Sequence, residues 1–231
     1  MRVLCVGDSL GLPREGCTYE ETWYYRLKIK YPNVEFVDVF TRALLITEAV
    51  SNYYGSYYKF YNADVVIVQT GICDCSPRLF NSNSRKGRLM LRVVKSLGLT
   101  TLFWKCVKRR DRDSNRVYTN PDIFFSCYNK LISLFVNDGI KKVILIKIGH
   151  ATPSVLKKSK FFNHNVDKYN NLIDKIARNY PGKIEIVNPL DNVTESMFVD
   201  GYHCNKNGME IVYNDLVKIL ESFFKETSNL K

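Results

Sequence analysis

The feature that most constrains the fold is a series of short apolar runs that recurs along the chain. Each run is four to seven residues long, which is the length of a buried strand rather than of a helix. Segments with helical patterning separate the runs. This alternation predicts an open parallel sheet with helices on both faces. The expected strands are residues 3–6, 34–40, 63–69, 142–148 and 184–187, and the expected helices are residues 19–31, 121–137, 166–178 and 205–224.

The length and continuity of the chain predict one domain. The 231 residues show no internal repeat and no linker, so we assign residues 1–231 to a single domain. Residues 43–61 begin like a further helix, but Gly55 and the tyrosines around it weaken the far end of that pattern. The helix at residues 19–31 has a possible capping box in Thr18 and Glu21.

Gly7-Asp8-Ser9 follows the first apolar run and is the first candidate for chemistry. Ligands of an open parallel sheet bind beyond the carboxyl ends of its strands, where this serine would lie. The turn after such a strand also directs backbone N–H groups outward, which suits a developing oxyanion. The alternative is an ordinary strand-ending turn, because this tripeptide is common in loops.

Asp200-Gly-Tyr-His203 lies near the other end of the sequence, just before the last predicted helix. A serine hydroxyl needs a base within hydrogen-bond reach, and a histidine can accept its proton near neutral pH. An aspartate three residues earlier can fold back to hold the imidazole in one tautomer. The alternative is a surface turn with an incidental histidine.

Together these motifs resemble the SGNH/GDSL hydrolase superfamily. The resemblance rests on Gly7-Asp8-Ser9-Leu10 after the first strand, and on Asp200-x-x-His203 followed by Asn205-x-x-Gly208 before the last helix. It implies a flavodoxin-like three-layer sandwich with a five-stranded parallel sheet. It also implies Ser9 as nucleophile, His203 as general base and Asp200 as the partner that orients the base.

Two blocks of the chain depart from the pattern of that superfamily. The family's third block is Gly-x-Asn-Asp, whose asparagine donates to the oxyanion, but here Gly71 and Asp74 enclose Cys73 instead. A thiol is a weak donor. The family's second block supplies a glycine N–H, and here Ala43 stands after the second strand. The expected oxyanion residues are Ser9, Ala43, Gly71 and Cys73.

The loops that follow these motifs contain two arginines. The stretches Leu12-Pro13-Arg14 and Asp74-Cys75-Ser76-Pro77-Arg78 look like a branch of the superfamily that is found with bacterial surface-polysaccharide genes. A guanidinium at the ligand face can bind a carboxylate or phosphate through two hydrogen bonds. Alternatively, the arginines are structural and pair with Asp74 or Glu15. The expected substrate-binding residues are Asp8, Arg14, Asp74 and Arg78.

The sequence offers no strong signal for a metal or a cofactor. Cys73, Cys75, His203 and Cys204 could approach one another at the end of the sheet, but Cys-x-Cys is not a usual zinc spacing. Glycine-rich phosphate loops of the dinucleotide or P-loop type are absent from the sequence. We therefore expect neither a metal nor a cofactor.

Most of the positive charge lies in one segment. The net charge is +11, and residues 85–116 contain eleven basic side chains against only Asp111 and Asp113. We treat this segment as a basic amphipathic insertion at about residues 80–120. It could be an ordinary solvated helix, a cover for the active-site mouth, an anionic membrane contact or a nucleic-acid contact. Its apolar content favours the membrane surface over nucleic acid among the functional alternatives.

These observations lead to one expected activity and two alternatives. We expect an SGNH/GDSL-type serine esterase that removes an acyl group, with a carbohydrate O-acetyl group as the expected substrate. The alternatives are an O-acyltransferase in surface-polysaccharide biosynthesis and a catalytically weak binding module on the same fold. Seven scattered cysteines and the lack of a secretory pattern after Met1 predict a cytoplasmic protein, peripheral to the inner face of the membrane if the basic segment binds lipid.

Overall fold

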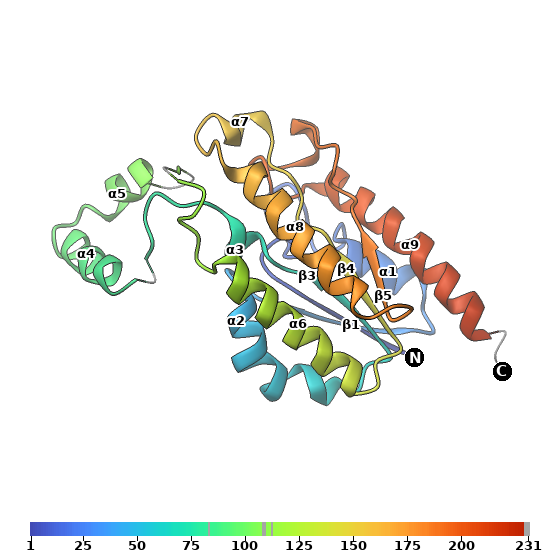
Figure 1. Cartoon of the computed structure of the whole chain (residues 1–231). Coiled ribbons are helices and arrows are strands. Elements are labelled where there is room, and N and C mark those ends of the chain that lie inside the picture. The colour runs from blue at the N-terminus through green and yellow to red at the C-terminus, as the bar shows by residue number, and fades with distance from the viewer. Residues whose placement is uncertain (83, 108–109, 112, 229–231) are drawn as a thin grey trace.

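The computed structural model describes residues 1–82, 84–107, 110–111 and 113–228. Its centre is a five-stranded parallel sheet with the strand order β2-β1-β3-β4-β5, which is the flavodoxin-like order (Figure 1). The predicted fold class is therefore confirmed. The strands are β1 (Arg2–Gly7), β2 (Glu35–Phe40), β3 (Val65–Gln69), β4 (Lys142–Ile146) and β5 (Ile184–Val187).

Helices connect these strands and cover the sheet. In chain order they are α1 (Trp23–Lys30), α2 (Ile46–Glu48), the π-helix η1 (Ala49–Tyr54), the 3-10 helix η2 (Tyr58–Tyr61), α3 (Ile72–Cys75), α4 (Arg85–Ser96), α5 (Thr100–Val107), α6 (Pro121–Asn137), α7 (Pro153–Leu156), α8 (Phe162–Arg178), the 3-10 helix η3 (Glu195–Met197) and α9 (Lys206–Ser228).

Two apolar cores lie on opposite faces of the sheet. One face packs against α2, α6 and α8, and the other packs against α1 and α9 (Figure 1). All five residues of β3 are buried, as expected for a central strand that is covered on both sides. Alternate residues of each inner strand enter opposite cores, since strand side chains alternate in direction.

The carboxyl ends of β1 and β3 approach each other closely at Gly7. A Cβ atom on Gly7 would lie 2.3 Å from the backbone oxygen of Gln69, so only glycine fits there. The same Gln69 oxygen accepts the N–H of Asp8 at 3.0 Å. The Gln69 side chain accepts the indole N–H of the buried Trp23 at 3.0 Å, which joins α1 to the sheet at this point.

Two predicted helical segments, residues 19–31 and 43–61, differ in extent or continuity from the observed helices, whereas α8 begins four residues before the predicted start and α9 ends four residues after the predicted end. The capping contact predicted at residue 18 exists, because the Thr18 N–H donates to Glu21 at 2.9 Å. However, α1 begins only at Trp23, since the N–H and hydroxyl of Thr22 both bond to the Tyr19 oxygen and close a separate turn. Residues 43–61 form three short pieces, and the π-helix in the middle accommodates the tyrosines that pack on α6.

The basic insertion forms a helical arm. In Figure 1, α4 and α5 project away from the sheet and its covering helices. Backbone hydrogen bonds from Arg78 to Arg116 and from Leu79 to Arg110 hold the two ends of the arm together. Lys108, Arg109 and Arg112 of the predicted basic segment lie outside the described residues. No helix in the described part of the chain is both long and apolar enough to cross a bilayer.

Candidate active site

Ser9 lies in the turn that leaves the carboxyl end of β1. The Asp8 side chain accepts the N–H of Leu10 at 2.9 Å, and the Asp8 backbone oxygen accepts the N–H of Gly11 at 3.4 Å. These bonds fold the chain back directly after the strand. The turn therefore holds Ser9 at the end of the sheet where ligands of parallel α/β folds bind.

His203 lies in a second turn, between β5 and α9. The Val199 N–H donates to the His203 oxygen at 2.9 Å, and Gly201 takes a φ of 91° between them. A side chain at Gly201 would collide with Val155, and its backbone oxygen accepts the N–H of Thr152 at 2.9 Å. The positive φ of Gly201 and its hydrogen bond to Thr152, in the loop before α7, therefore fix this turn.

The two turns bring Ser9, His203 and Asp200 into one hydrogen-bonded chain. Ser9 Oγ lies 3.1 Å from His203 Nε2, and His203 Nδ1 lies 2.9 Å from Asp200 Oδ2. The other carboxylate oxygen of Asp200 accepts the backbone N–H of His203 at 3.0 Å, which fixes the carboxylate. The distances from Ser9 to the His203 ring and from the His203 ring to Asp200 are both short enough for proton transfer. With Nδ1–H donating to Asp200, Nε2 is left to accept the serine proton.

Two backbone N–H groups beside Ser9 are available to an oxyanion. Those of Ser9 and Ala43 donate to no residue that the structure describes, and both residues line the cleft above the serine. Ala43 has a φ of 56°, in the left-handed region that glycine normally occupies. Ala43 thus takes a glycine-like backbone conformation at the position where the SGNH/GDSL pattern has glycine.

The other two predicted oxyanion residues lie differently. Cys73 lines the cleft, but burial raises the pKa of its thiol far above the usual range, so the thiol stays protonated. Gly71 is buried below the cleft with a φ of 122°, and a side chain there would meet Ile148. Gly71 shapes the start of α3 and does not line the cleft.

Ser9 and His203 open into a cleft of about 580 Å³. The loops after β1, β2 and β3 and the turn before α9 form its walls. The lining residues are Ser9, Leu12, Pro13, Arg14, Arg42, Ala43, Ile72, Cys73, Ser76, Arg78, Asp200, Tyr202 and His203.

Arg14 and Arg78 both line this cleft, and backbone oxygens hold their guanidinium groups. Arg14 donates to the oxygen of Ser9 and, at 3.4 Å, to that of Leu12. Arg78 donates to the Cys73 oxygen at 3.4 Å and stacks on Tyr118 at 3.9 Å. Within the described residues neither arginine forms an ion pair with Asp74 or Glu15, and both instead donate to backbone oxygens close by in the chain.

Asp8 and Asp74 lie below the cleft rather than in it. Both are fully buried. Asp74 accepts the N–H of Ile46 at 3.1 Å and the hydroxyl of Thr119, which ties the segment after Ala43 to α3 and to the chain before α6. Burial raises the pKa of each carboxyl to about 7. These two side chains position the loops of the site, and the structure gives them no contact with the cleft.

Three polar side chains of the described cleft lining were missed by the sequence analysis, as were the apolar Leu12, Pro13 and Ile72. The Tyr202 ring lies against the His203 ring, with ring centres 4.3 Å apart. The position of this tyrosine in the sequence between Asp200 and His203 could have identified it as a site residue. Arg42 precedes Ala43 in the second block, so the same alignment could have found it. Ser76 carries no signal of its own, because only the path of the loop after α3 brings it to the wall.

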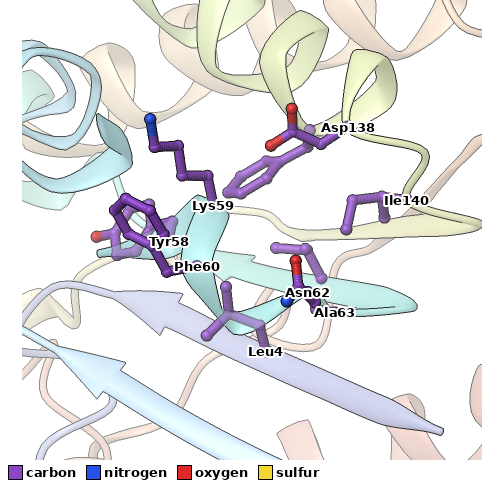
Figure 2. Close-up of a pocket in the computed structure, with 10 residues that line it drawn as sticks. Leu4, Tyr58, Lys59, Phe60, Asn62, Ala63, Asp138 and Ile140 are labelled. Carbon is purple, nitrogen blue, oxygen red and sulfur yellow. The ribbon is translucent and has the colours of Figure 1, made fainter. Parts of the chain in front are cut away.

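A side cavity of about 130 Å³ adjoins the cleft and shares Ser76, Arg78 and Tyr202 with it. A third cavity, of about 320 Å³, lies at the opposite end of the sheet between Leu4, Tyr58, Lys59 and Asp138 (Figure 2). Its described lining contains no serine, cysteine or histidine, so it offers no counterpart to the Ser9–His203 pair. No group of three or more metal-binding side chains occurs in the described part of the chain.

Comparisons with known proteins bear on the fold. The sequence matches no protein-family model and no curated protein. The structure is similar to the acetyl xylan esterase AlAXEase, with 16% identity, a TM-score of 0.60 and 95% and 99% of the two chains covered. It is also similar to a lipase/acylhydrolase from Enterococcus faecalis, with 13% identity, a TM-score of 0.62 and 96% of each chain covered.

A third similar structure is a member of the lipolytic protein G-D-S-L family from Veillonella parvula, with 13% identity and a TM-score of 0.58, which covers 94% of this chain and 97% of the other. The chain therefore has the fold of the SGNH/GDSL hydrolases over nearly its whole length. This confirms, at the level of the fold, the resemblance predicted from the first and last motifs.

The buried Asp8 predicts an unusual pH dependence of stability. Its pKa rises from about 4 in the unfolded chain to about 7 in the folded protein, mainly because of burial. The folded state therefore loses stability as the pH rises from 4 to 7, when the unfolded chain has already released this proton. We expect Asp8→Asn, which keeps the acceptor for Leu10, to reduce this loss by about 2–4 kcal/mol.

The measurement is the free energy of unfolding by urea at several pH values, with the exposed Asp122→Asn as the control for the charge change. Parallel pH curves for wild type and Asp8→Asn would contradict the prediction.

Proposed function

We propose that this protein is a serine esterase that hydrolyses an acyl ester, with a carbohydrate O-acetyl group as its substrate. The observation that carries the proposal is the chain from Ser9 Oγ to His203 Nε2 at 3.1 Å and from His203 Nδ1 to Asp200 at 2.9 Å. It lies in an open cleft beside two free backbone N–H donors. This intact chain favours an enzyme over a binding module.

In the first half of the reaction, Ser9 Oγ attacks the ester carbonyl while His203 Nε2 takes the serine proton. Asp200 stabilises the imidazolium that forms. The N–H groups of Ser9 and Ala43 receive the oxyanion of the tetrahedral intermediate. The intermediate collapses when the C–O bond to the leaving alcohol breaks, and that alcohol takes the proton from Nε2. The acyl group is then bound to Ser9.

In the second half, His203 Nε2 removes a proton from water, which attacks the acyl-enzyme and releases the acid. Ser9 recovers its proton from Nε2. A sugar hydroxyl in place of water would make the same enzyme an O-acyltransferase. The side cavity that shares Tyr202 with the cleft offers space for such an acceptor next to the acyl group.

Two further observations support a saccharide ester. One structurally similar protein is an acetyl xylan esterase, and another is described as an acetyl-xylooligosaccharide esterase from Geobacillus. The catalytic cleft of this chain is open, and its described lining includes the charged or polar side chains of Arg14, Arg42, Ser76, Arg78 and Tyr202. An acetyl group on a polar ring fits this shape better than a long acyl chain does.

The arm formed by α4 and α5 supports a membrane contact. Leu89, Met90, Val93 and Leu97 lie on one face of α4 and are between 48% and 64% exposed. Basic residues occupy much of the opposite face, and the sequence from Arg85 to Val107 contains no acidic residue. Contiguous exposed apolar surface marks an interaction site, and a helix with this pattern suits the interface of an anionic bilayer.

The charge of the arm argues against a second copy as the occupant of this face. Two arms packed together would bring like charges into contact, which is unfavourable. We therefore propose an anionic membrane surface as the partner of the α4 face. We propose the cytoplasmic face of the membrane as the site of action, and the seven free cysteines, which suit a reducing compartment, support this proposal.

The proposed nucleophile is tested by intact mass after incubation with a fluorophosphonate. We expect one adduct on wild type, none on Ser9→Ala, and one on Ser76→Ala, which removes another serine of the same cleft. Acetylated xylo-oligosaccharides and 4-nitrophenyl acetate are then assayed for release of acetate. A folded wild type that gains no adduct and releases no acetate would overturn the esterase proposal.

Cys73→Asn should raise the activity. An asparagine amide at this position would add a donor to the Ser9 and Ala43 N–H groups, and one such donor is worth about 10²–10³ in rate at other sites. We expect kcat for 4-nitrophenyl acetate to rise at least about tenfold, with Cys73→Ala close to wild type. An unchanged or lower kcat in a folded Cys73→Asn protein would show that the Cys73 side chain does not face the oxyanion.

The membrane proposal is tested by sedimentation with vesicles of phosphatidylcholine, alone or mixed with phosphatidylglycerol. We expect binding only to the mixed vesicles, and at least about tenfold weaker binding for Leu89→Ser/Leu97→Ser, because each leucine contributes about 1.5–3 kcal/mol when buried. Ile29→Ser, an equally exposed residue of α1, is the control. Wild type that stays in solution, or a dimer that the double variant dissociates, would contradict the membrane contact.

A further inference from the structure

We propose that the ester bound in this cleft carries a negatively charged group, a carboxylate or a phosphate, which Arg14, Arg42 and Arg78 bind next to Ser9. The inference rests on the proposed esterase function and specifies its substrate class. It depends on the charge of the cleft, on the way the arginines are anchored, and on the side cavity that Arg78 shares.

The first observation is the charge of the cleft lining. Three arginines face a single carboxylate, that of Asp200. Asp200 is hydrogen-bonded to the His203 ring at 2.9 Å, so its negative charge lies next to the imidazole. Asp8 and Asp74 are fully buried below the cleft, and burial raises their pKa to about 7. Glu48, whose charge also acts on Cys73, accepts the Leu45 N–H at 3.1 Å and does not line the cleft. The cleft that receives the substrate is therefore positively charged.

The second observation is that backbone oxygens and an aromatic ring hold the arginines without neutralising them. Arg14 is held by Ser9 and Leu12 oxygens, and Arg78 by the Cys73 oxygen and the face of Tyr118. The Tyr118 hydroxyl is itself hydrogen-bonded to Ser82 at 2.7 Å. Asp200 acts on Arg14 electrostatically, but no ion pair joins Arg14 or Arg78 to a carboxylate among the residues that the structure describes. Fixed, half-buried guanidinium groups of this kind form a preorganised site for an oxyanion.

Arg42 contributes a third guanidinium group to the lining of the same cleft. It is exposed, it precedes Ala43, and within the described residues it forms no ion pair. Arg14 follows β1, Arg42 follows β2 and Arg78 follows β3, so three neighbouring strands each place one arginine on the same cleft. A charged group of a bound ester would meet positive charge from three directions.

The third observation is the side cavity, which extends the charged cleft under the arm. Arg78 stands between the two spaces, and Arg110 lines the far side. Trp104 of α5 and Phe80, with ring centres 6.1 Å apart, form part of its wall. Aromatic faces next to arginines suit a ring that bears an anionic substituent. The cavity of about 130 Å³ is large enough for part of one sugar ring.

The test compares three acetylated sugars that differ in charge: acetyl glucuronic acid, acetyl glucose 6-phosphate and acetyl glucose. Binding to full-length Ser9→Ala is measured by calorimetry and by the fluorescence of Trp104, and kcat/KM is measured on the wild type. We expect both charged sugars to bind at least about tenfold more tightly than the neutral one. The tighter of the two identifies a carboxylate or a phosphate as the preferred anion.

Arg42→Gln and Arg78→Gln, each combined with Ser9→Ala for binding, should reduce the preference for the charged sugars at least about fivefold. Arg178→Gln, an exposed arginine in the last turn of α8, removes the same charge away from the cleft and should leave the preference unchanged. Equal binding of charged and neutral sugars, or an equal effect of all three substitutions, would overturn the inference.

These outcomes separate the inference from the proposed activity. Tight binding of a charged sugar without release of acetate would refute the esterase and leave the anion site standing. Equal turnover of charged and neutral esters would support the esterase and refute the anion site.

Discussion

The close packing of β1 against β3 at their carboxyl ends is the constraint on which the site depends. Gly7 leaves no room for a side chain against the Gln69 backbone, and Gln69 also binds Asp8 and Trp23. The turn that carries Ser9 starts from this contact. A shift of β1 relative to β3 would move the serine away from His203, which a separate turn holds. The distance of 3.1 Å between the two side chains is thus set by the sheet.

Acidic side chains lie below Ser9, and basic side chains lie above it. Two buried carboxyls, Asp8 and Asp74, hold the loops of the site through bonds to Leu10, Ile46 and Thr119, and burial raises the pKa of each to about 7. Arginines line the cleft above them. The arm extends the same positive charge outward, and its Trp104 reaches the wall of the side cavity. The arm therefore carries the proposed membrane contact on α4 and lines the cavity beside the proposed anion site with Trp104 of α5.

Local patterns were sufficient to predict most of the fold. The strand at residues 184–187 was predicted with its observed bounds, and the helix at residues 121–137 begins as expected, with the Asn120 side chain accepting the N–H of Ile123 at 2.9 Å. The failures occurred where long-range contacts compete with local preference. Residues 43–61 break into short pieces because their tyrosines pack against α6, and nothing within the segment itself encodes that neighbour.

The sequence by itself determined the alternation of strands and helices, the motifs around Ser9 and His203, and the concentration of basic residues in one insertion, since each of these depends on residues near one another in the chain. Only the tertiary structure decided that Ala43 adopts a glycine-like φ, that Asp74 is buried while Arg78 faces the cleft, and that Arg42 and Tyr202 belong to the site. The physical reason is that loops from different strands come together in space to form the cleft. Which side chains are buried, which line the cleft and which remain without an ion pair depends on those contacts between distant segments, and no single segment of sequence encodes them.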